Sequence, residues 1–361
     1  MAGNRLLFLR ETWSWMGSVS GFDPFISAVE ALPGVASTSV WVPDKIPPAG
    51  LWERIHERLT RPSSAPRAPS PFTAHRHEWI THRVLSAMSA FRDAVGLLSA
   101  GENQYGGVFS SAAPEIRSRL VVCFHQPPSW WRLHWRDVSL LNGLKAIVCL
   151  CQEQQDYFTA LSSTPVIMLR HGVLHDFFTP EFDRLPGSPR LLFVGHWLRD
   201  LDVLEMAMNS IWQSRPDIEL DCLIPIHARD HPVLTRLARN SRVHWHSGLF
   251  PEQVRELYRQ AILLFLPFID AAANNGIVEA LACGLPIVST RVGGIPDYVP
   301  DDCGRLCAPG DAKDHACAVI DLINNKELLD RKKRACRRHA EKTLNWKDSA
   351  QLFHDFLASL K

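Results

Sequence analysis

The residues best suited to chemistry lie in the segment 261–299, which reads AILLFLPFIDAAANNGIVEALACGLPIVSTRVGGIPDYV. Its first apolar run predicts a buried strand, and a helix is expected to begin near Asn274 or Asn275 after a short loop. The first backbone N–H groups of such a helix have no partner within the helix, and they suit a phosphate. Glu279, about one turn inside the helix, can accept hydrogen bonds from the paired hydroxyls of a ribose. The same residues also fit an ordinary N-capped helix with a solvated glutamate.

Length and composition indicate what kind of protein contains this segment. The chain has 361 residues, 46% of them hydrophobic and 21% charged, which favours two packed domains and excludes a disordered chain. Its 39 basic and 38 acidic residues leave a net charge of +1, so no overall field attracts nucleic acid or an anionic membrane. The nine cysteines include no C-x-x-C pair, and we expect reduced thiols in a cytoplasmic protein. We expect neither a signal peptide nor a membrane-spanning helix, because no apolar run reaches 18 residues.

Short apolar runs alternate with helical patterns along the chain, as in βαβ units with buried parallel strands. The runs of the first half are 5–10, 38–43, 119–125, 146–151 and 164–172. After the polar segment 182–189, the alternation begins again with the runs 190–195, 219–226, 242–248, 261–268 and 285–290. The pattern predicts two α/β halves joined near residue 185. A final amphipathic helix is expected to begin near Trp346 and needs an apolar surface to cover.

The segment 261–299 resembles the retaining family-four glycosyltransferases of the GT-B fold. Their pattern is E-x7-E followed by A-x-A-C-G-x-P-V-V and then G-G-x-x-E. The residues that match it, with small replacements, are Glu279, Ala280, Ala282, Cys283, Gly284, Pro286, Val288, Gly293, Gly294 and Asp297. Further segments resemble the first strand of the family's donor domain, its L-Y-x-x-A helix, its interdomain segment and its last helix, and they are 192–195, 246–267, 169–180 and 345–357. The resemblance covers residues 165–361 in register.

The resemblance implies an α/β fold of the GT-B type, with two facing Rossmann-like domains. An acceptor-binding domain would cover residues 1–182, a donor-binding domain residues 183–345, and the helix 346–361 would cross back onto the first domain. The implied reaction moves a sugar from a nucleoside-diphosphate sugar to an acceptor hydroxyl with retention of anomeric configuration. The acceptor would be a glycan, a glycolipid or a small molecule, and no metal or other cofactor is expected.

The resemblance also assigns roles on the donor side. Glu279 would hold the nucleotide ribose, and the backbone of Asn274, Asn275 and Gly276 would meet the diphosphate. Leu249, which follows Gly248, stands where the family packs the nucleotide base. The first glutamate of the family pattern falls at position 271, where this chain has Ala271 preceded by Asp270. We expect Asp270 to contribute to the donor site, and the choice of donor sugar stays open.

The family's cationic clamp on the leaving diphosphate, a Gly-Arg pair followed by a lysine, appears here in altered form. The corresponding residues are Gly195-His196-Trp197-Leu198-Arg199-Asp200. We expect Arg199 to supply the cation with His196 assisting. An alternative is that Arg199 makes a surface salt bridge at a helix start.

The first domain carries weaker signals. The segment GSVSGFDPF from Gly17 resembles the family's glycine-rich loop, so Gly17 and Ser18 are expected near the donor and Gly21 near the acceptor. It is not a G-x-S-x-G nucleophile elbow, because Val19 stands at its centre. His125 follows a buried strand, where the family often carries a histidine beside the reacting sugar; the alternative is a structural histidine. The expected stacking platforms for an acceptor sugar, alternatively core aromatics, are Trp13, Trp15, Trp130 and Trp131.

Two further functions fit the same sequence. Ala271 favours a degenerate relative that binds a nucleotide sugar without turnover, and an epimerase of the same fold is the other alternative. The basic run 331–338 predicts either a solvated helix face or a peripheral contact with anionic lipid at the cytoplasmic face of a membrane. The histidines in HRHEWITH, at 75, 77 and 82, lack the H-E-x-x-H spacing, so no metal site is expected.

Overall fold

The computed structural model describes residues 5–11, 19–43, 74–134, 138–183 and 188–360. They form two compact units, each built around a parallel sheet of six strands. Unit 1 consists of Met1–Ser14, Phe25–Leu169 and Ala350–Lys361, and unit 2 of Trp15–Pro24 and Arg170–Ser349. The prediction of two α/β units is therefore confirmed. None of the described helices is both long and apolar enough to cross a membrane.

The sheet of unit 1 has the strand order β2-β1-β3-β4-β5-β6. Its strands are β1 (Leu6–Glu11), β2 (Ser37–Val42), β3 (Val95–Leu98), β4 (Leu120–Cys123), β5 (Ala146–Cys149) and β6 (Val166–Met168). The helices are α1 (Asp23–Glu30), α3 (Ala74–Ala90), α4 (Gly101–Gln104), α5 (Pro114–Arg117), α6 (Pro128–His134), α7 (Gln152–Leu161) and the C-terminal part of α15 (Trp346–Ser359), with a π-helix at Tyr105–Phe109 and a 3-10 helix at Ser139–Gly143. Because β2 and β3 lie on opposite sides of β1, the connections diverge between β1 and β3.

Alternate residues of β1 serve the two faces of the unit 1 sheet. Leu7 and Leu9 belong to the same buried cluster as Ile80, Val84 and Met88 of α3. Leu6 and Phe8 are also buried and point to the other face, as the two-residue period of a strand requires. The apolar part of β1 is thus covered on both faces, as in a buried parallel strand, whereas the edge strand β2 is partly polar and partly exposed.

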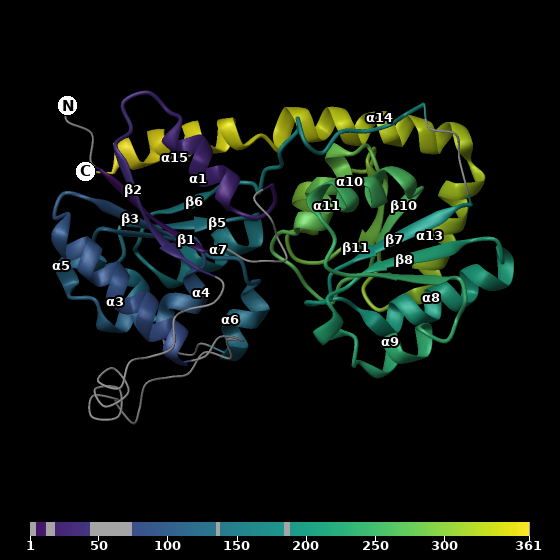
Figure 1. Cartoon of the computed structure of the whole chain (residues 1–361), viewed down its shortest axis with the longest axis horizontal. Helices are drawn as coiled ribbons and strands as arrows, with labels where there is room; N and C mark the ends of the chain where they lie inside the picture. The colour runs from purple at the N-terminus through teal and green to yellow at the C-terminus, as the bar shows by residue number, and fades with distance from the viewer. Residues whose placement is uncertain (1–4, 12–18, 44–73, 135–137, 184–187, 361) are drawn as a thin grey trace. The chain divides into compact units, whose positions relative to one another are not determined.

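The sheet of unit 2 has the strand order β12-β11-β10-β7-β8-β9, which is the Rossmann order. Its strands are β7 (Arg190–Val194), β8 (Glu219–Leu223), β9 (Val243–His246), β10 (Leu263–Leu266), β11 (Ile287–Thr290) and β12 (Gly304–Cys307). The helices are α8 (Leu201–Ser214), α9 (Pro232–Leu237), α10 (Pro251–Gln260), α11 (Asn275–Ala282), α12 (Ile295–Tyr298), α13 (Ala312–Asn324) and α14 (Lys326–Thr343), with a 3-10 helix at Ile226–Ala228 (Figure 1). The connections diverge between β7 and β10.

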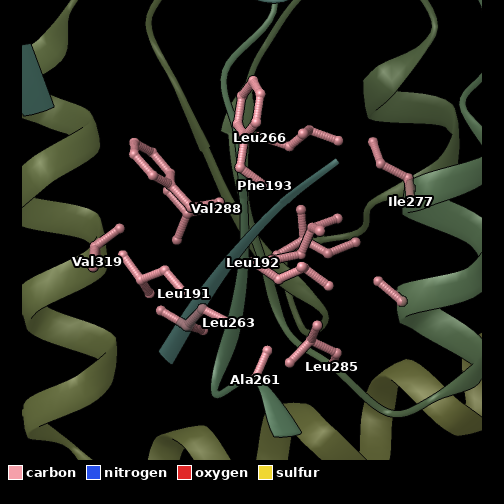
Figure 2. Packing of buried hydrophobic residues seen from close by; sticks show 14 of the residues in the cluster. Leu191, Leu192, Phe193, Ala261, Leu263, Leu266, Ile277, Leu285, Val288 and Val319 are labelled. Carbon is pink, nitrogen blue, oxygen red and sulfur yellow. The ribbon is translucent and has the colours of Figure 1, made fainter. Parts of the chain in front are cut away.

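The core of unit 2 lies on both sides of its sheet. Figure 2 shows Val319 of α13 on one side of the strands and Ile277 of α11 on the other. Leu191 and Leu192, neighbours in β7, are both fully buried and lie toward opposite sides. Both faces of β7 are therefore dry, which fixes the register of the strand and holds the loops that follow it.

Two segments that the sequence analysis assigned to the first domain group with unit 2. They are Trp15–Pro24 and residues 170–182. The ring of Phe22 lies 5.7 Å from the ring of Trp346 and 6.5 Å from that of His171, in edge-on arrangements. These aromatic contacts tie both segments to the start of α15.

Candidate active site

The start of α11 lies beside the carboxyl end of β7. The N-cap of the helix is Asn274, whose side-chain oxygen accepts a hydrogen bond from the backbone of Ile277 at 3.3 Å. A β-carbon on Gly276 would lie 3.5 Å from Cβ of Val194 and 3.1 Å from the Asn274 side-chain oxygen. Glycine therefore lets the first turn of α11 approach β7 closely. This places the positive end of the helix at the divergence point of the sheet, where an anion is stabilised.

Glu279 lies on the second turn of α11 and is only 6% exposed. One carboxylate oxygen accepts a hydrogen bond from the Tyr258 hydroxyl at 2.8 Å, and the other accepts one from the Ser20 hydroxyl. Burial raises the pKa of Glu279 to about 7, while the two hydroxyl groups oppose that rise. The alternative of a solvated glutamate is therefore wrong. A buried carboxylate that accepts hydrogen bonds from two hydroxyl groups can also bind the two hydroxyl groups of a diol.

The surroundings of Glu279 are closed. The residues that line a small hollow beside its carboxylate include Val19, Ser20, Gly21, Gly172 and Trp346. No space for a water molecule remains inside it. Gly21, expected near the acceptor, thus lies in the same hollow as Glu279. Ser20 occupies the place that a ligand hydroxyl would take on the carboxylate.

Arg199 follows β7 in a strained loop and is 8% exposed. Gly195 and Leu198 both have positive φ, +75° and +55°, and such a conformation is costly for leucine. The Arg199 guanidinium donates to the backbone oxygens of Val194 at 3.0 Å and Trp197 at 2.9 Å. Burial lowers its pKa to about 9, so the group stays charged at neutral pH.

Among the described residues, the hydrogen-bond partners of the Arg199 guanidinium are backbone oxygens and no carboxylate perturbs its pKa, so the salt-bridge alternative does not hold. The ring of Phe268 lies 4.2 Å from the guanidinium carbon instead. The loops after β7 and β10 also pair with each other, because the backbone of Asp200 donates to Pro267 at 3.0 Å. A buried cation without a counter-ion at this place is suited to an anionic ligand.

Position 271, where the first family glutamate is replaced, is shaped by the glycine pair that follows β11. Ala271 is buried, and its backbone oxygen accepts a hydrogen bond from Gly294 at 2.8 Å. A β-carbon on Gly293 would lie 2.1 Å from that same oxygen and 2.5 Å from a side-chain oxygen of Asp270. The Asp270 carboxylate accepts a hydrogen bond from the Ala271 backbone N–H at 2.8 Å. The glycine pair therefore holds the backbone at 270–271, and it does so without a glutamate.

The remaining donor-side residues lie at the ends of other strands or beside Arg199. His196 is exposed, and its pKa is lowered by partial burial and by the nearby His227 and Arg199. Its backbone oxygen accepts a hydrogen bond from the Arg199 N–H at 3.3 Å, so the two residues share one turn. Gly248 follows β9 with φ +64°, and Leu249 packs partly against the core of unit 2.

The structure brings together four of the predicted donor-side residues: Asn274 is the N-cap of α11, and the helix itself carries Asn275, Gly276 and Glu279. No hydrogen bond among the described residues joins Gly248 or Leu249 to them. The expected place of the nucleotide base beside Leu249 therefore stays a prediction.

His125 follows β4 in unit 1 and is held by its backbone. Its N–H donates to both oxygens of Glu102 at 3.1 and 3.2 Å, and its Nε2 lies 2.6 Å from the backbone oxygen of Ser99. That distance requires a proton on Nε2 in the neutral ring. Burial lowers the pKa of His125, so the ring is neutral at pH 7. Glu102 is buried, and burial raises its pKa to about 7.

The expected aromatic platform is corrected by the structure. Trp131 is fully buried and Trp130 is 8% exposed. Trp131 packs edge-on against Phe124 at 4.7 Å and Phe158 at 5.5 Å. The ring of Trp130 stacks on that of His134 at 4.5 Å. Both tryptophans belong to the buried core cluster of unit 1, so they are core aromatics and offer no open face to a sugar. Trp13, Trp15, Gly17 and Ser18 lie outside the described residues.

The basic run on α14 is only partly solvated. Lys332 is buried and donates to two backbone oxygens near β12. Arg337 donates to three backbone oxygens, including that of the last residue of α11. The side chains that remain exposed are Arg331, Arg334 and Arg338. In the part of the chain that the structure describes, no group of three His, Cys, Asp or Glu side chains could hold a metal ion.

The sequence analysis missed Tyr258, Ser20 and Glu102. Tyr258 stands in the L-Y-x-x-A segment, which offered a signal for its position and none for its hydroxyl contact. Ser20 is 259 residues from Glu279 in the chain, so no local pattern predicts their contact. Glu102 had a weak signal, as an acidic residue shortly after the apolar strand β3.

The match to a known family falls in unit 2. A family model described as "Glycosyl transferases group 1" matches residues 188–325. A Mycolicibacterium hassiacum protein, MMP alpha-(1->4)-mannosyltransferase, is 29% identical over 138 residues, 37% of this chain and 34% of that protein. A Streptomyces avermitilis D-inositol 3-phosphate glycosyltransferase is 26% identical over 213 residues, 53% of this chain and 46% of that protein. The chain thus spans less than half the length of these two curated relatives.

Solved structures match over nearly the whole chain. Sucrose-phosphate synthase from Thermosynechococcus elongatus has a TM-score of 0.73 at 16% identity, covering 98% of this chain and 100% of that one. Anabaena HepE, solved in complex with UDP and glucose, has a TM-score of 0.68 at 15% identity, covering 99% and 100%. These likenesses show the fold, which is that of the GT-B glycosyltransferases.

Proposed function

Because residues 188–325 belong to the group 1 glycosyl transferases, we propose that this chain moves a sugar from a nucleoside-diphosphate sugar to an acceptor hydroxyl. One observation carries the proposal: Glu279 is buried at the divergence point of a Rossmann sheet, with both oxygens on hydroxyl groups. One ribose hydroxyl can take the place of the Ser20 hydroxyl, and the second can donate to a free lone pair of the carboxylate while Tyr258 stays bound. The carboxylate then keeps its partners while the nucleotide is bound.

Cleavage of the sugar–phosphate bond leaves negative charge on the diphosphate and positive charge on the sugar. Unit 2 supplies groups that stabilise the negative charge. The leaving diphosphate is stabilised by the Arg199 guanidinium and by the backbone at the start of α11. A developing oxocarbenium ion on the sugar is then the positive partner. We propose retention of configuration, by attack on the face from which the diphosphate leaves. The proposal includes no metal, because Arg199 and the helix meet the charge of the diphosphate.

The names of the relatives indicate how far donor and acceptor vary among them. Beside the mannosyltransferase and the inositol-phosphate enzyme, they include a human phosphatidylinositol N-acetylglucosaminyltransferase polypeptide, 30% identical over 156 residues, 42% of this chain and 32% of that protein. The names thus run from an inositol phosphate to a phosphatidylinositol lipid. We propose a cytoplasmic enzyme with a sugar, glycolipid or small-molecule acceptor. Peripheral membrane contact would use the exposed arginines of α14, Arg331, Arg334 and Arg338.

The test is a thermal-shift panel of UDP-, GDP-, TDP- and ADP-sugars on the full chain. A ligand at about 100 times its dissociation constant adds roughly 2.7 kcal/mol of stability. We expect one nucleotide class to raise Tm in the wild type and in the control Glu252→Ala, which alters an exposed side chain on α10. The shift is expected to vanish in Glu279→Ala. A panel without any shift would refute the donor site.

Ala271 favours a second candidate, a protein that binds a nucleotide sugar without transferring it. The two candidates differ in product and not in binding. With the donor found by the panel, sugar release or transfer is followed by chromatography over many enzyme equivalents. Binding that depends on Glu279 together with no turnover for any acceptor would support the second candidate.

A further inference from the structure

Unit 1 contains two buried glutamines, one with a fully hydrogen-bonded side chain and one whose side chain has no hydrogen-bond partner among the described residues. Gln154 is fully buried, and both ends of its amide are hydrogen-bonded. Its oxygen accepts from the backbone of Leu150 at 2.7 Å, and its nitrogen donates to the backbone oxygens of Phe124 at 3.0 Å and Gln126 at 2.8 Å. Gln104 is 1% exposed, and neither its amide oxygen nor its amide nitrogen has a partner among the described residues.

Gln104 ends α4, the helix that follows β3, and belongs to a small cluster of buried polar groups with Glu11, Arg76 and Glu102. Glu11 ends β1 and pairs with Arg76 at 3.4 Å, while its Oε1 has no partner in the described part of the chain. The Gln104 amide lies beside the Glu11 carboxylate and acts to lower its pKa, although the two side chains are not aligned as a hydrogen bond. Burial and the nearby charge of Glu102 both raise the pKa of Glu11. Burial has the largest effect, so the pKa lies above its usual value.

Glu11 and Gln104 together have three unpaired polar atoms among the described residues, which is unusual for one buried cluster. A buried donor or acceptor without a partner destabilises a fold, and native structures contain few of them. The cluster lies where the connections of the unit 1 sheet diverge between β1 and β3, which is where open α/β sheets bind ligands. Groups retained there at a cost in stability are typical of a functional site.

The chemistry of the unpaired atoms selects a class of ligand. Gln104 offers one donor group and one acceptor, and Glu11 offers one acceptor. The carboxylates of Glu11 and Glu102 would repel a phosphate or carboxylate ligand, and Arg76 would repel an ammonium group. A neutral diol fits: one hydroxyl donates to Glu11 and accepts from Gln104, and the next donates to the Gln104 oxygen.

We propose that Gln104 and Glu11 form a binding site for a neutral polyhydroxyl group, which is the part of the acceptor that unit 1 recognises. The role as acceptor rests on the proposed transferase function, whereas the binding of a polyol does not. Glu102 connects this site to His125, whose backbone N–H it holds at 3.1 Å. The polar atoms are shielded from water in this structure, so a ligand reaches them after neighbouring side chains move.

The first experiment compares stability. Gln104→Leu and Gln154→Leu are matched, since each replaces a buried glutamine of unit 1 with an apolar side chain of similar size. We expect Gln154→Leu to lower Tm by several degrees and Gln104→Leu to leave Tm unchanged or higher, because Gln104 has no bonds to lose. Gln104→Met serves if Gln104→Leu does not fold. An equal loss of Tm in the variants at both positions would assign Gln104 a structural role and overturn the proposal.

The second experiment measures binding without a donor. Saturation-transfer NMR on the full chain uses myo-inositol, methyl glucosides and methyl mannosides, each beside a phosphorylated counterpart. We expect at least one neutral polyol to bind and its phosphorylated form to bind more weakly. Gln104→Leu is expected to weaken that binding by about tenfold or more, as the loss of one or two hydrogen bonds predicts.

The outcomes separate this proposal from the transferase function. Binding of no neutral polyol, or stronger binding of the phosphorylated forms, would overturn the polyol site. Polyol binding that depends on Gln104, together with a donor panel that gives no shift, would keep the site and remove the transferase proposal.

Discussion

The raised pKa of Glu279 makes donor affinity depend on pH in a defined direction. With a pKa of about 7 in the free protein, Glu279 is about one-tenth ionised at pH 6 and about nine-tenths ionised at pH 8. Ribose hydroxyls donate to the carboxylate, so the ionised form is the one that binds. The dissociation constant of a nucleoside-diphosphate sugar is therefore expected to fall by about tenfold, or about 1.4 kcal/mol, from pH 6 to pH 8.

Titration calorimetry at pH 6, 7 and 8 measures this dependence, with the donor that the thermal-shift panel identifies. His196 acts against it, because a protonated ring attracts the diphosphate at low pH; its lowered pKa keeps that effect small above pH 6. Glu279→Gln is the matched control, and we expect weak binding that does not vary with pH. Wild-type affinity that is flat over this range, or a slope that persists in Glu279→Gln, would refute the reasoning.

Three more variants probe the same contacts. Tyr258→Phe removes a hydroxyl that lowers the pKa of Glu279, so the pH midpoint of donor binding in the same calorimetry is expected to move upward. Gly293→Ala is expected to lower the free energy of unfolding by about 3 kcal/mol, because its β-carbon would lie 2.1 Å from a backbone oxygen; Gly310→Ala, with positive φ and open space, costs only about 1 kcal/mol in the same urea titration. Arg199→Met is expected to weaken binding of a nucleoside diphosphate by about 2 to 3 kcal/mol and to leave binding of the nucleoside unchanged, by calorimetry.

Elements of unit 2 could be predicted well because their signals are local. The helix expected near Asn274 or Asn275 begins at Asn275, since Asn274 has the side chain of an N-cap. The apolar runs at 190–195 and 261–268 contain β7 and β10, and their carboxyl ends lie at the divergence of the sheet. The positions of Glu279 on a helix and of Arg199 after a strand could therefore be predicted from the sequence, and the roles expected for them stay predictions.

Residues that depend on contacts between distant segments were not found. The burial of Trp131 depends on Phe124 and Phe158, which reach it from the end of β4 and from α7, and a tryptophan pair after a strand looks the same in a core and in a binding site. The pairing of Ser20 with Glu279 joins residues 259 positions apart. The contrast between Gln104 and Gln154 has no sequence signal at all, because both are glutamines a few residues after apolar strands.

The two buried carboxylates with a pKa of about 7 differ in what holds them, and that difference separates their roles. Glu102 accepts from the backbone N–H of His125, and a ligand that displaced it would leave that N–H buried without a partner. Glu279 accepts from two side-chain hydroxyls, and the Ser20 hydroxyl can rotate away when a ligand hydroxyl replaces it, while the buried Tyr258 hydroxyl stays in place. Replacing a hydrogen-bond partner by a ligand hydroxyl therefore costs less free energy at Glu279 than at Glu102. Glu279 is suited to reading a ligand, and Glu102 is suited to holding the strand end that carries His125.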